Sequence, residues 1–205
     1  MQQHDVTSIQ ALEALYGTAG EASIAKELDV IDANYRALIK AAPFIAIATA
    51  GPNGLDCSPR GDPGGFVDVI DEKTLIIPDR RGNNRIDSLR NLITNPQIAI
   101  LFLIPGVGET LRVNGRARIS SNPAQLQRYA VDGKVPRVVL VVTVDAVFFQ
   151  CSRAVLRADL WNPARHVHRS TLPSAGKILA DATDSKIDGL AYDAALPGRL
   201  KVSLY

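Results

Sequence analysis

Residues 74–96, TLIIPDRRGNNRIDSLRNLITNP, hold the pattern that decides the fold. Residues 74–78 are short, apolar and β-branched, which predicts a buried strand that ends at Pro78. Apolar residues spaced three and four apart then predict a helix that ends at Asn95-Pro96: Ile86, Leu89, Leu92 and Ile93. Asn83 or Asn84 is the expected N-cap of this helix. The stretch therefore predicts a strand, a basic loop and a helix in immediate succession.

Further strand-like runs lie on both sides of this unit. They are residues 44–50, 55–62, 66–70, 97–104, 110–120 and 137–151. Most connections between them are short, and the turn GPNG at residues 51–54 predicts a hairpin. A regular βαβαβ alternation is absent from the sequence. We therefore expect a mainly β, α+β protein, a small barrel of six to seven antiparallel strands with peripheral helices.

Chain length and the distribution of these runs predict one domain over residues 1–205. Residues 1–42 are expected to form a helical N-terminal extension, and residues 43–151 the barrel core. Residues 152–205 are expected to form helices that pack on the barrel or on a dimer partner. The termini are therefore predicted to be helical and the centre to be β.

Charge is unevenly distributed along a chain whose formal net charge is only +2. Residues 80–169 carry 14 basic and 5 acidic side chains, and all the basic ones except Lys134 are arginines. Arginine binds phosphates and carboxylates through two parallel hydrogen bonds, so this centre suggests an anionic ligand. A nucleic-acid binder is disfavoured by the 5% aromatic content and by the absence of a recognition motif.

No signal peptide begins the sequence, and its apolar runs are too short to span a bilayer, so a cytoplasmic location is expected. Cys57 and Cys151 show no metal-type spacing and are interpreted as buried reduced thiols, with a single disulfide as the alternative. His166 and His168 lack a third ligand nearby, so they are interpreted as surface residues and no metal site is expected.

The loop at residues 78–85 has the chemistry of a phosphate site. Arg80, Arg81 and Arg85 lie within six residues, just before a helix whose free N–H groups and dipole favour an anion. The alternative, a polar loop with solvated arginines, is about equally supported by these residues alone. No nucleophile, catalytic pair or metal cluster stands out, so any chemistry would belong to a bound cofactor.

The ordered segments FIAIATA, SPRGD, TLIIPDRRGNNRIDSLRNLITNP and ETLRVNGRARI resemble the pyridoxamine 5′-phosphate oxidase-like flavoproteins over residues 30–150. The segments SPRGD and PDRRGNNR resemble those of an uncharacterised subgroup of that family. The resemblance implies a split β-barrel and a homodimer that holds FMN at its interface. The family's C-terminal signature for the phosphate of the substrate is absent here.

The resemblance also implies roles for individual residues. Ile77, Pro78 and Asp79 correspond to the strand whose backbone contacts the flavin ring. Asn83, Asn84 and Arg85 correspond to the residues that hold the FMN phosphate. The remaining residues expected to reach FMN are Ser58, Arg60, Arg80, Thr110 and Arg112.

Together these features predict an FMN-dependent oxidoreductase that acts on an unknown small molecule. The alternatives are a non-catalytic flavin binder or sensor, and a reductase that uses the deazaflavin F420 on the same fold. Neither a nucleic acid nor a membrane is an expected partner.

Overall fold

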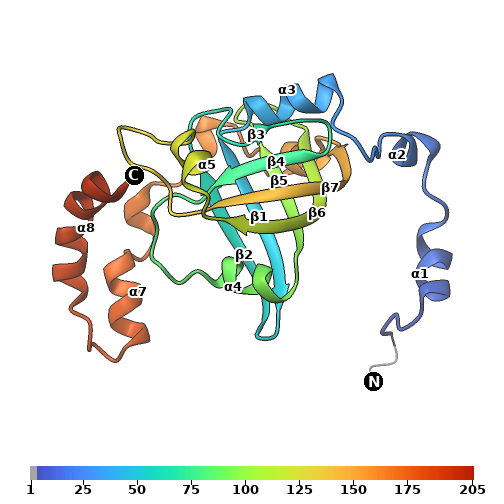
Figure 1. The fold of residues 1–205 in the computed structure, drawn as a ribbon. Coiled ribbons are helices and arrows are strands. Elements are labelled where there is room, and N and C mark those ends of the chain that lie inside the picture. Colours follow the sequence, from blue (N-terminus) through green and yellow to red (C-terminus); the bar gives the residue numbers. More distant parts are fainter. Residues whose placement is uncertain (1–3) are drawn as a thin grey trace.

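The computed structural model describes residues 4–205 and places seven strands in one sheet (Figure 1). The strands are β1 (Phe44–Gly51), β2 (Gly54–Gly61), β3 (Asp68–Val69), β4 (Thr74–Pro78), β5 (Gln97–Leu103), β6 (Thr110–Ser120) and β7 (Val139–Gln150). Their order is β2-β1-β5-β6-β7-β4-β3, and all neighbouring strands are antiparallel. The expected mainly β architecture with six to seven antiparallel strands is confirmed.

The β1–β2 hairpin forms where the sequence predicts it. Gly51 pairs with Gly54, which leaves Pro52 and Asn53 as a two-residue turn. Gly54 has a φ of +107°, a backbone conformation that favours glycine. This hairpin places residues 55–61 on the outer edge of the sheet.

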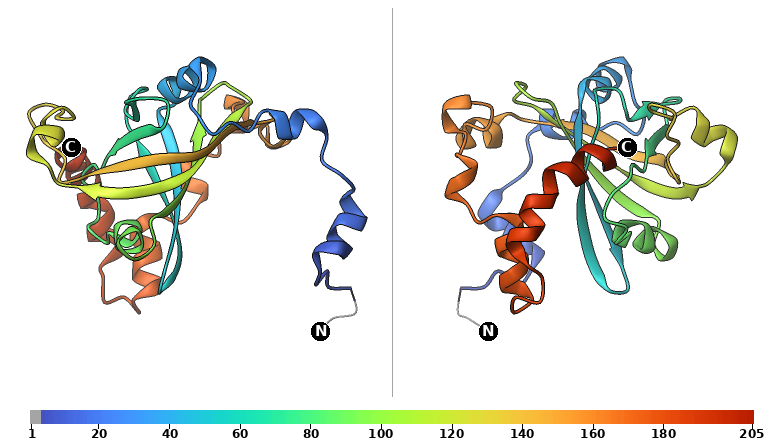
Figure 2. Two further views of the ribbon diagram at one scale, coloured as in Figure 1. Left: turned by 45° about the vertical axis from the view of Figure 1, so that its right-hand side comes forward. Right: turned by 90° about the vertical axis from the view of Figure 1, so that its left-hand side faces the viewer.

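A β-bulge bends the two longest strands. Asn114 pairs with Ala146 and Gly115 with Val144, so Asp145 is an extra residue in β7. A Cβ atom at position 115 would lie 2.2 Å from the carbonyl oxygen of Thr143, so the strands approach each other as closely as they do only because this residue is glycine. The sheet curls around its core, and within residues 4–205 its end strands β2 and β3 are not paired with each other (Figure 2). The barrel is therefore split.

Helices surround the sheet. They are α1 (Ile9–Tyr16), α2 (Glu21–Ala25), α3 (Ala33–Ala41), α4 (Asp87–Thr94), α5 (Pro123–Gln127), α6 (Arg153–Ala158), α7 (Ala175–Ala182) and α8 (Gly189–Ser203), with 3₁₀ turns at Pro163–Arg165 and Arg169–Thr171. α3 covers one end of the barrel and buries Tyr35 and Ile39. α4 packs against β1, where the Asn91 side chain donates to the Thr49 hydroxyl at 3.2 Å.

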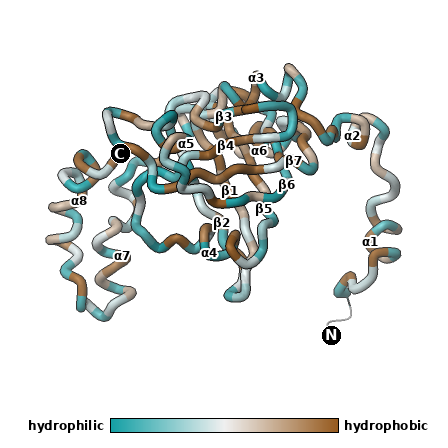
Figure 3. Tube along the Cα trace, in the orientation of Figure 1, coloured by the Kyte–Doolittle hydropathy of each residue, from teal (hydrophilic) through white to brown (hydrophobic). Residues whose placement is uncertain are grey.

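Apolar side chains that alternate along the strands fill the barrel. Ile45 and Ile47 of β1 face Ile98, Ile100 and Phe102 of β5, and each is at most 4% exposed. Burial of such side chains is the main driving force of folding. Figure 3 shows the hydrophobic residues concentrated in the strands, and further ones on the terminal helices.

The two ends of the chain lie on opposite sides of the barrel (Figure 1, Figure 2). α1 and α2 project away from it, and neither helix buries a residue. α7 and α8 form a helical hairpin on the other side, and Trp161 fastens the preceding segment to the barrel by donating to the Val107 carbonyl at 2.7 Å. The expected division at residues 42 and 152 stays a prediction, and residues 1–3 of the expected extension lie outside the described residues.

Two local expectations need correction. Cys57 and Cys151 are free, as expected, but both are exposed and not buried, because Cys57 lies on the outward face of the edge strand β2 and Cys151 just after β7. The run 66–70 contributes only the short strand β3, because Pro63, Gly64 and Gly65 precede it. Within residues 4–205 no helix is both long and apolar enough to cross a membrane.

Candidate functional site

The site begins where β4 leaves the sheet. Leu75, Ile76, Ile77 and Pro78 are all buried, so β4 is an inner strand fixed on both faces. Pro78 pairs with Val139, and the Asp79 backbone N–H then donates to Val138 at 3.1 Å. Beyond Asp79 the chain runs as a loop to Ile86. Because the side chains of Ile77 and Pro78 are both buried, these residues can offer a ligand only their backbone.

Arg60 and Asp79 meet at this edge, although they come from different strands. The Arg60 Nε atom lies 3.4 Å from the Asp79 Oδ1 atom, and both side chains are about one fifth exposed. Burial raises the pKa of the Asp79 carboxyl above its usual value, and the positive charge of Arg60 offsets only part of that rise. Two residues expected at one site therefore contact each other.

Arg80 points to the other side of the loop and contacts Asp62. Its Nε atom lies 2.7 Å from Asp62 Oδ2, and its Nη1 atom donates to the Tyr129 carbonyl at 2.6 Å. The side chains of Arg80 and Asp62 are 16% and 3% exposed. A carboxylate this deeply buried needs charged or hydrogen-bonding partners, so this contact fixes the first turn of the loop.

The loop is exposed, and its backbone does not form the helix start that the sequence predicts. The Asn83 side chain accepts a hydrogen bond from the Arg85 backbone N–H at 3.0 Å, which closes a local turn. Asn84 and Ile86 have φ values of +60° and +55°. The helix therefore begins only at Asp87, with Ile86 at the cap position and no side-chain cap. The expectation that Asn83 or Asn84 caps this helix is wrong.

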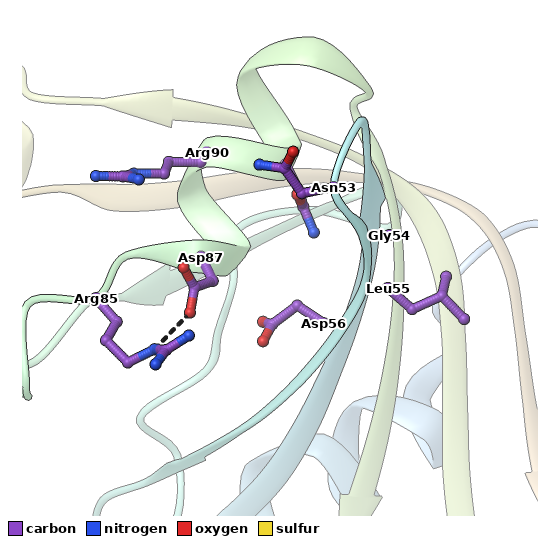
Figure 4. A pocket seen from close by; sticks show the side chains of 8 residues that line it. Asn53, Gly54, Leu55, Asp56, Arg85, Asp87 and Arg90 are labelled. Atoms are coloured by element: carbon purple, nitrogen blue, oxygen red, sulfur yellow. Dashed lines mark hydrogen bonds and ion pairs between the residues drawn. The ribbon is translucent and has the colours of Figure 1, made fainter. Parts of the chain in front are cut away.

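A polar cavity of about 230 Å³ lies between the loop, α4 and the β1–β2 turn (Figure 4). Its lining residues are Asn53, Gly54, Leu55, Asp56, Arg85, Asp87, Arg90 and Asn91. Figure 4 shows Asp56 directed toward the ion pair of Arg85 and Asp87, whereas Leu55 points to the other side of β2. The Arg85 Nε atom lies 2.7 Å from Asp87 Oδ2, and 76% of the Arg85 side chain is exposed. The ion pair uses only Nε, so the outer Nη groups of Arg85 face solvent.

Ser58 and Ser88 hold the Asp56 side chain, which lines this cavity. Both hydroxyls donate to Asp56 Oδ2, that of Ser58 at 2.8 Å. These bonds, Ser88 first, hold the pKa of the Asp56 carboxyl below its usual value, and the charges of Arg60 and Arg85 add to the effect. Asp56 is therefore a fixed negative charge next to the basic loop, and a bound anion would have to approach from the arginine side.

Thr110 and Arg112 lie on β6, on either side of Leu111, which is linked to Arg60 across the sheet through Phe102 and Ile45. Thr110 pairs with Gln150 at one end of β7, whereas Pro78 pairs with Val139 at the other. At about 3.3 Å per residue, this twelve-residue strand is roughly 35 Å long. Arg112 is exposed, and its guanidinium lies 5.4 Å from the centre of the Phe148 ring. The two groups of expected residues are therefore far apart along β7, but only three strand spacings, about 14 Å, separate Leu111 from Arg60 across the sheet.

The residue chemistry fits the phosphate of a nucleotide cofactor. Arg81 and Arg85 expose guanidinium groups on one loop, and the exposed amides of Asn83 and Asn84 add hydrogen-bond donors. Asn84 also accepts from Arg137 Nη1 at 3.4 Å, which brings a further cation to the loop. Among residues 4–205 no group of three or more His, Cys, Asp or Glu residues is arranged to hold a metal ion.

Sequence reasoning missed Asp62, Tyr129 and Ser88, which hold the loop and the cavity together. Asp62 was part of the SPRGD motif and could have been noticed as an acidic residue beside arginines. Tyr129 and Ser88 gave no such signal, because they act through contacts between residues distant in sequence.

Comparisons with known proteins identify one family. A family model described as pyridoxamine 5′-phosphate oxidase matches residues 31–151. No curated protein matches the chain. HupZ of Group A Streptococcus is 21% identical, with 60% of this chain and 95% of that chain covered and a TM-score of 0.49. A putative pyridoxamine 5′-phosphate oxidase from Lactobacillus delbrueckii is 17% identical, with 60% of this chain and 98% of that chain covered and a TM-score of 0.47. An F420 reductase is 19% identical, with 57% of this chain and 97% of that chain covered and a TM-score of 0.43.

Proposed function

The chain belongs to the pyridoxamine 5′-phosphate oxidase family, and we propose that it binds FMN and acts as an oxidoreductase on a small molecule. The observation that carries this proposal is the basic loop at residues 79–86, which leaves a buried strand beside Arg60 and presents exposed arginines and asparagines. An enzyme that lacks its own nucleophile or metal cluster needs a cofactor for redox chemistry, and a flavin supplies hydride transfer.

Arg85 and the side-chain amides of Asn83 and Asn84 would hold the FMN phosphate. Hydrogen bonds between a guanidinium and a phosphate are charge-assisted and geometrically specific. The turn that Asn83 closes with the Arg85 N–H keeps these residues together on a short piece of chain. The backbone at Ile77, Pro78 and Asp79 would line the ring, since their side chains are buried or paired.

We further propose that two copies of the chain complete the site. Thr110 and Arg112 flank Leu111 on β6, which lies three strand spacings from Arg60 across the sheet. In the proposed dimer, Thr110 and Arg112 of the second copy pack against the loop of the first. A two-fold dimer makes two identical sites of this kind. The expected cytoplasmic location stays a prediction.

The purified protein tests the proposal directly. We expect the absorption bands of an oxidised flavin in the purified protein, or tight binding when FMN is titrated into the apoprotein. Protein that neither carries flavin nor binds added FMN would contradict the proposal. Competition between FMN and F420 separates the two cofactors, because the preferred one displaces the other.

Turnover assays with NADH, NADPH and oxygen decide whether the bound flavin is used for catalysis. Reduction of the bound flavin by a nicotinamide donor, followed by reoxidation, supports an oxidoreductase. Stable FMN binding without reduction by any donor would instead favour a flavin binder or sensor.

A further inference from the structure

Tyr205 lies against Asp62 and Arg80, at the start of the basic loop. Its hydroxyl donates to Asp62 Oδ1 at 2.6 Å, while Arg80 Nε binds the other oxygen of the same carboxylate at 2.7 Å. The Arg80 guanidinium lies 5.7 Å from the centre of the Tyr205 ring, within the range of a cation–π contact. The Asp62 carboxylate is therefore shared between a loop residue and a residue 143 positions further along the chain.

This contact, which we call the Tyr205 anchor (Asp62, Arg80 and Tyr205), joins distant parts of the fold. Asp62 follows β2, Arg80 follows β4, and Tyr205 follows α8. Arg80 also donates to the carbonyl of Tyr129, just beyond α5. A buried carboxylate with both oxygens bonded is stable only while its partners stay in place. Loss of one partner is expected to loosen the others.

The anchor is also the second attachment of the C-terminal hairpin. The first is Trp161, which binds the Val107 carbonyl of the β5–β6 turn. Between these two points α7 and α8 pair closely, since Gly176 and Gly189 face each other and the Gly176 N–H donates to Asp193 at 2.7 Å. Tyr205, which follows α8, thus joins the end of the hairpin to Arg80 at the start of the basic loop.

We propose that Tyr205 and Asp62 are positioning residues that hold the basic loop in the arrangement that binds the flavin phosphate. Arg80 directly follows Asp79, so its direction sets the path of residues 81–86. Those residues are exposed, and the hydrogen bonds and ion pairs of Asn83, Asn84 and Arg85 join them to one another or to Asp87 and the exposed Arg137. The inference rests on the proposed function, because it concerns the same loop, and it adds a role for the C-terminal hairpin.

The test compares Tyr205→Phe and Tyr205→Ala with wild type. Phe keeps the ring beside Arg80 and removes the hydroxyl, whereas Ala removes both. If the loop is in its binding arrangement only about a third to a tenth of the time without the hydroxyl, the apparent Kd for FMN rises about three- to tenfold. Tyr205→Ala should weaken binding further. Tryptic cleavage of the apoprotein after Arg81 and Arg85 should accelerate in the same order.

Tyr192→Phe is the matched control, because Tyr192 also stacks on an arginine, Arg199, at 4.1 Å but lies within α8 away from the loop. It should bind FMN and resist trypsin as wild type does. Thermal unfolding midpoints of the apoproteins show whether a variant is less stable than wild type. Cleavage rates in the loop are then compared at a temperature at which every variant is folded.

Wild-type FMN affinity and wild-type tryptic rates in both Tyr205 variants would overturn the inference. If wild type itself does not bind FMN, the proposed function fails. Cleavage after Arg81 and Arg85 would then still decide whether the Tyr205 anchor holds the loop.

Discussion

At the scale of single residues, Arg85 carries most of the phosphate proposal. Its Nη groups face solvent although its Nε pairs with Asp87. Hydrogen bonds to charged groups are strong enough that Arg85→Ala should weaken FMN binding about 10- to 100-fold, measured by fluorescence titration. Arg165→Ala is the matched control, because Arg165 is also exposed and pairs with an aspartate at 3.1 Å. Equal affinities for the two variants would remove Arg85 from the site.

Asp79 gives a second prediction, on the pH dependence of stability. Burial raises its pKa above the ordinary value of 3.8. At pH values between the ordinary pKa and the raised pKa, the folded protein therefore binds more protons than the unfolded protein. The free energy of unfolding of wild type, minus that of Asp79→Asn, should therefore decrease as the pH rises through this interval. Denaturant titrations of both proteins at several pH values measure this difference in the free energy of unfolding.

Asp193 provides a control of opposite sign. Hydrogen bonds from Ser174 and from the Gly176 N–H lower the pKa of its carboxyl. The stability that Asp193 contributes is present above its ordinary pKa and is lost as the pH falls through the lowered value. The wild-type minus Asp193→Asn difference should thus increase with pH. Curves with slopes of the same sign for Asp79→Asn and Asp193→Asn would contradict one of the two assignments.

At the scale of elements, the bulge between β6 and β7 depends on Gly115. A Cβ atom there would lie 2.2 Å from a backbone carbonyl oxygen, which cannot move without breaking the ladder. Gly115→Ala should destabilise the protein by about 1–3 kcal/mol, the usual cost of overpacking, as measured by denaturant unfolding. Gly20→Ala, whose added Cβ atom would meet nothing within 4 Å, should leave stability nearly unchanged. A small effect at position 115 would mean that the strands can separate there.

The sequence predicted the regular elements well, because β-branched runs and turn glycines act locally. The strands at residues 44–50, 97–104 and 110–120 appear as expected. The start of α4 was predicted too early, because the Asn83 side chain closes a turn instead of capping the helix. The contact between Tyr205 and Asp62 could not be predicted, since neither residue has a local pattern that depends on the other.

The proposed site residues illustrate the same limit. Arg60 and Asp79 were both expected to contact FMN, and in the structure their side chains lie 3.4 Å from each other. Thr110 and Arg112 were expected beside the same cofactor, and they flank Leu111, which is three strand spacings from Arg60 across the sheet. A motif reveals which residue types a ligand needs, whereas the distance between motifs depends on the register of the sheet.

At the scale of the whole molecule, the proposal that two copies share each site is testable. If each FMN contacts the loop of one copy and Arg112 of the other, then Arg85→Ala and Arg112→Ala each damage both sites of a homodimer. A mixed dimer of the two variants behaves differently. One of its sites carries both substitutions, while the other combines the intact loop of one copy with the intact Arg112 of its partner.

Co-expression of the two variants with different affinity tags isolates the mixed dimer, and light scattering confirms its mass. We expect it to bind one FMN per dimer with wild-type affinity, whereas each parent homodimer binds weakly. If instead each site were built within one chain, every site of the mixed dimer would carry one substitution, and no tight site would be restored. Recovery of half the tight sites therefore distinguishes a site shared between copies from one contained in a single chain, and a monomeric wild type would exclude the shared site altogether.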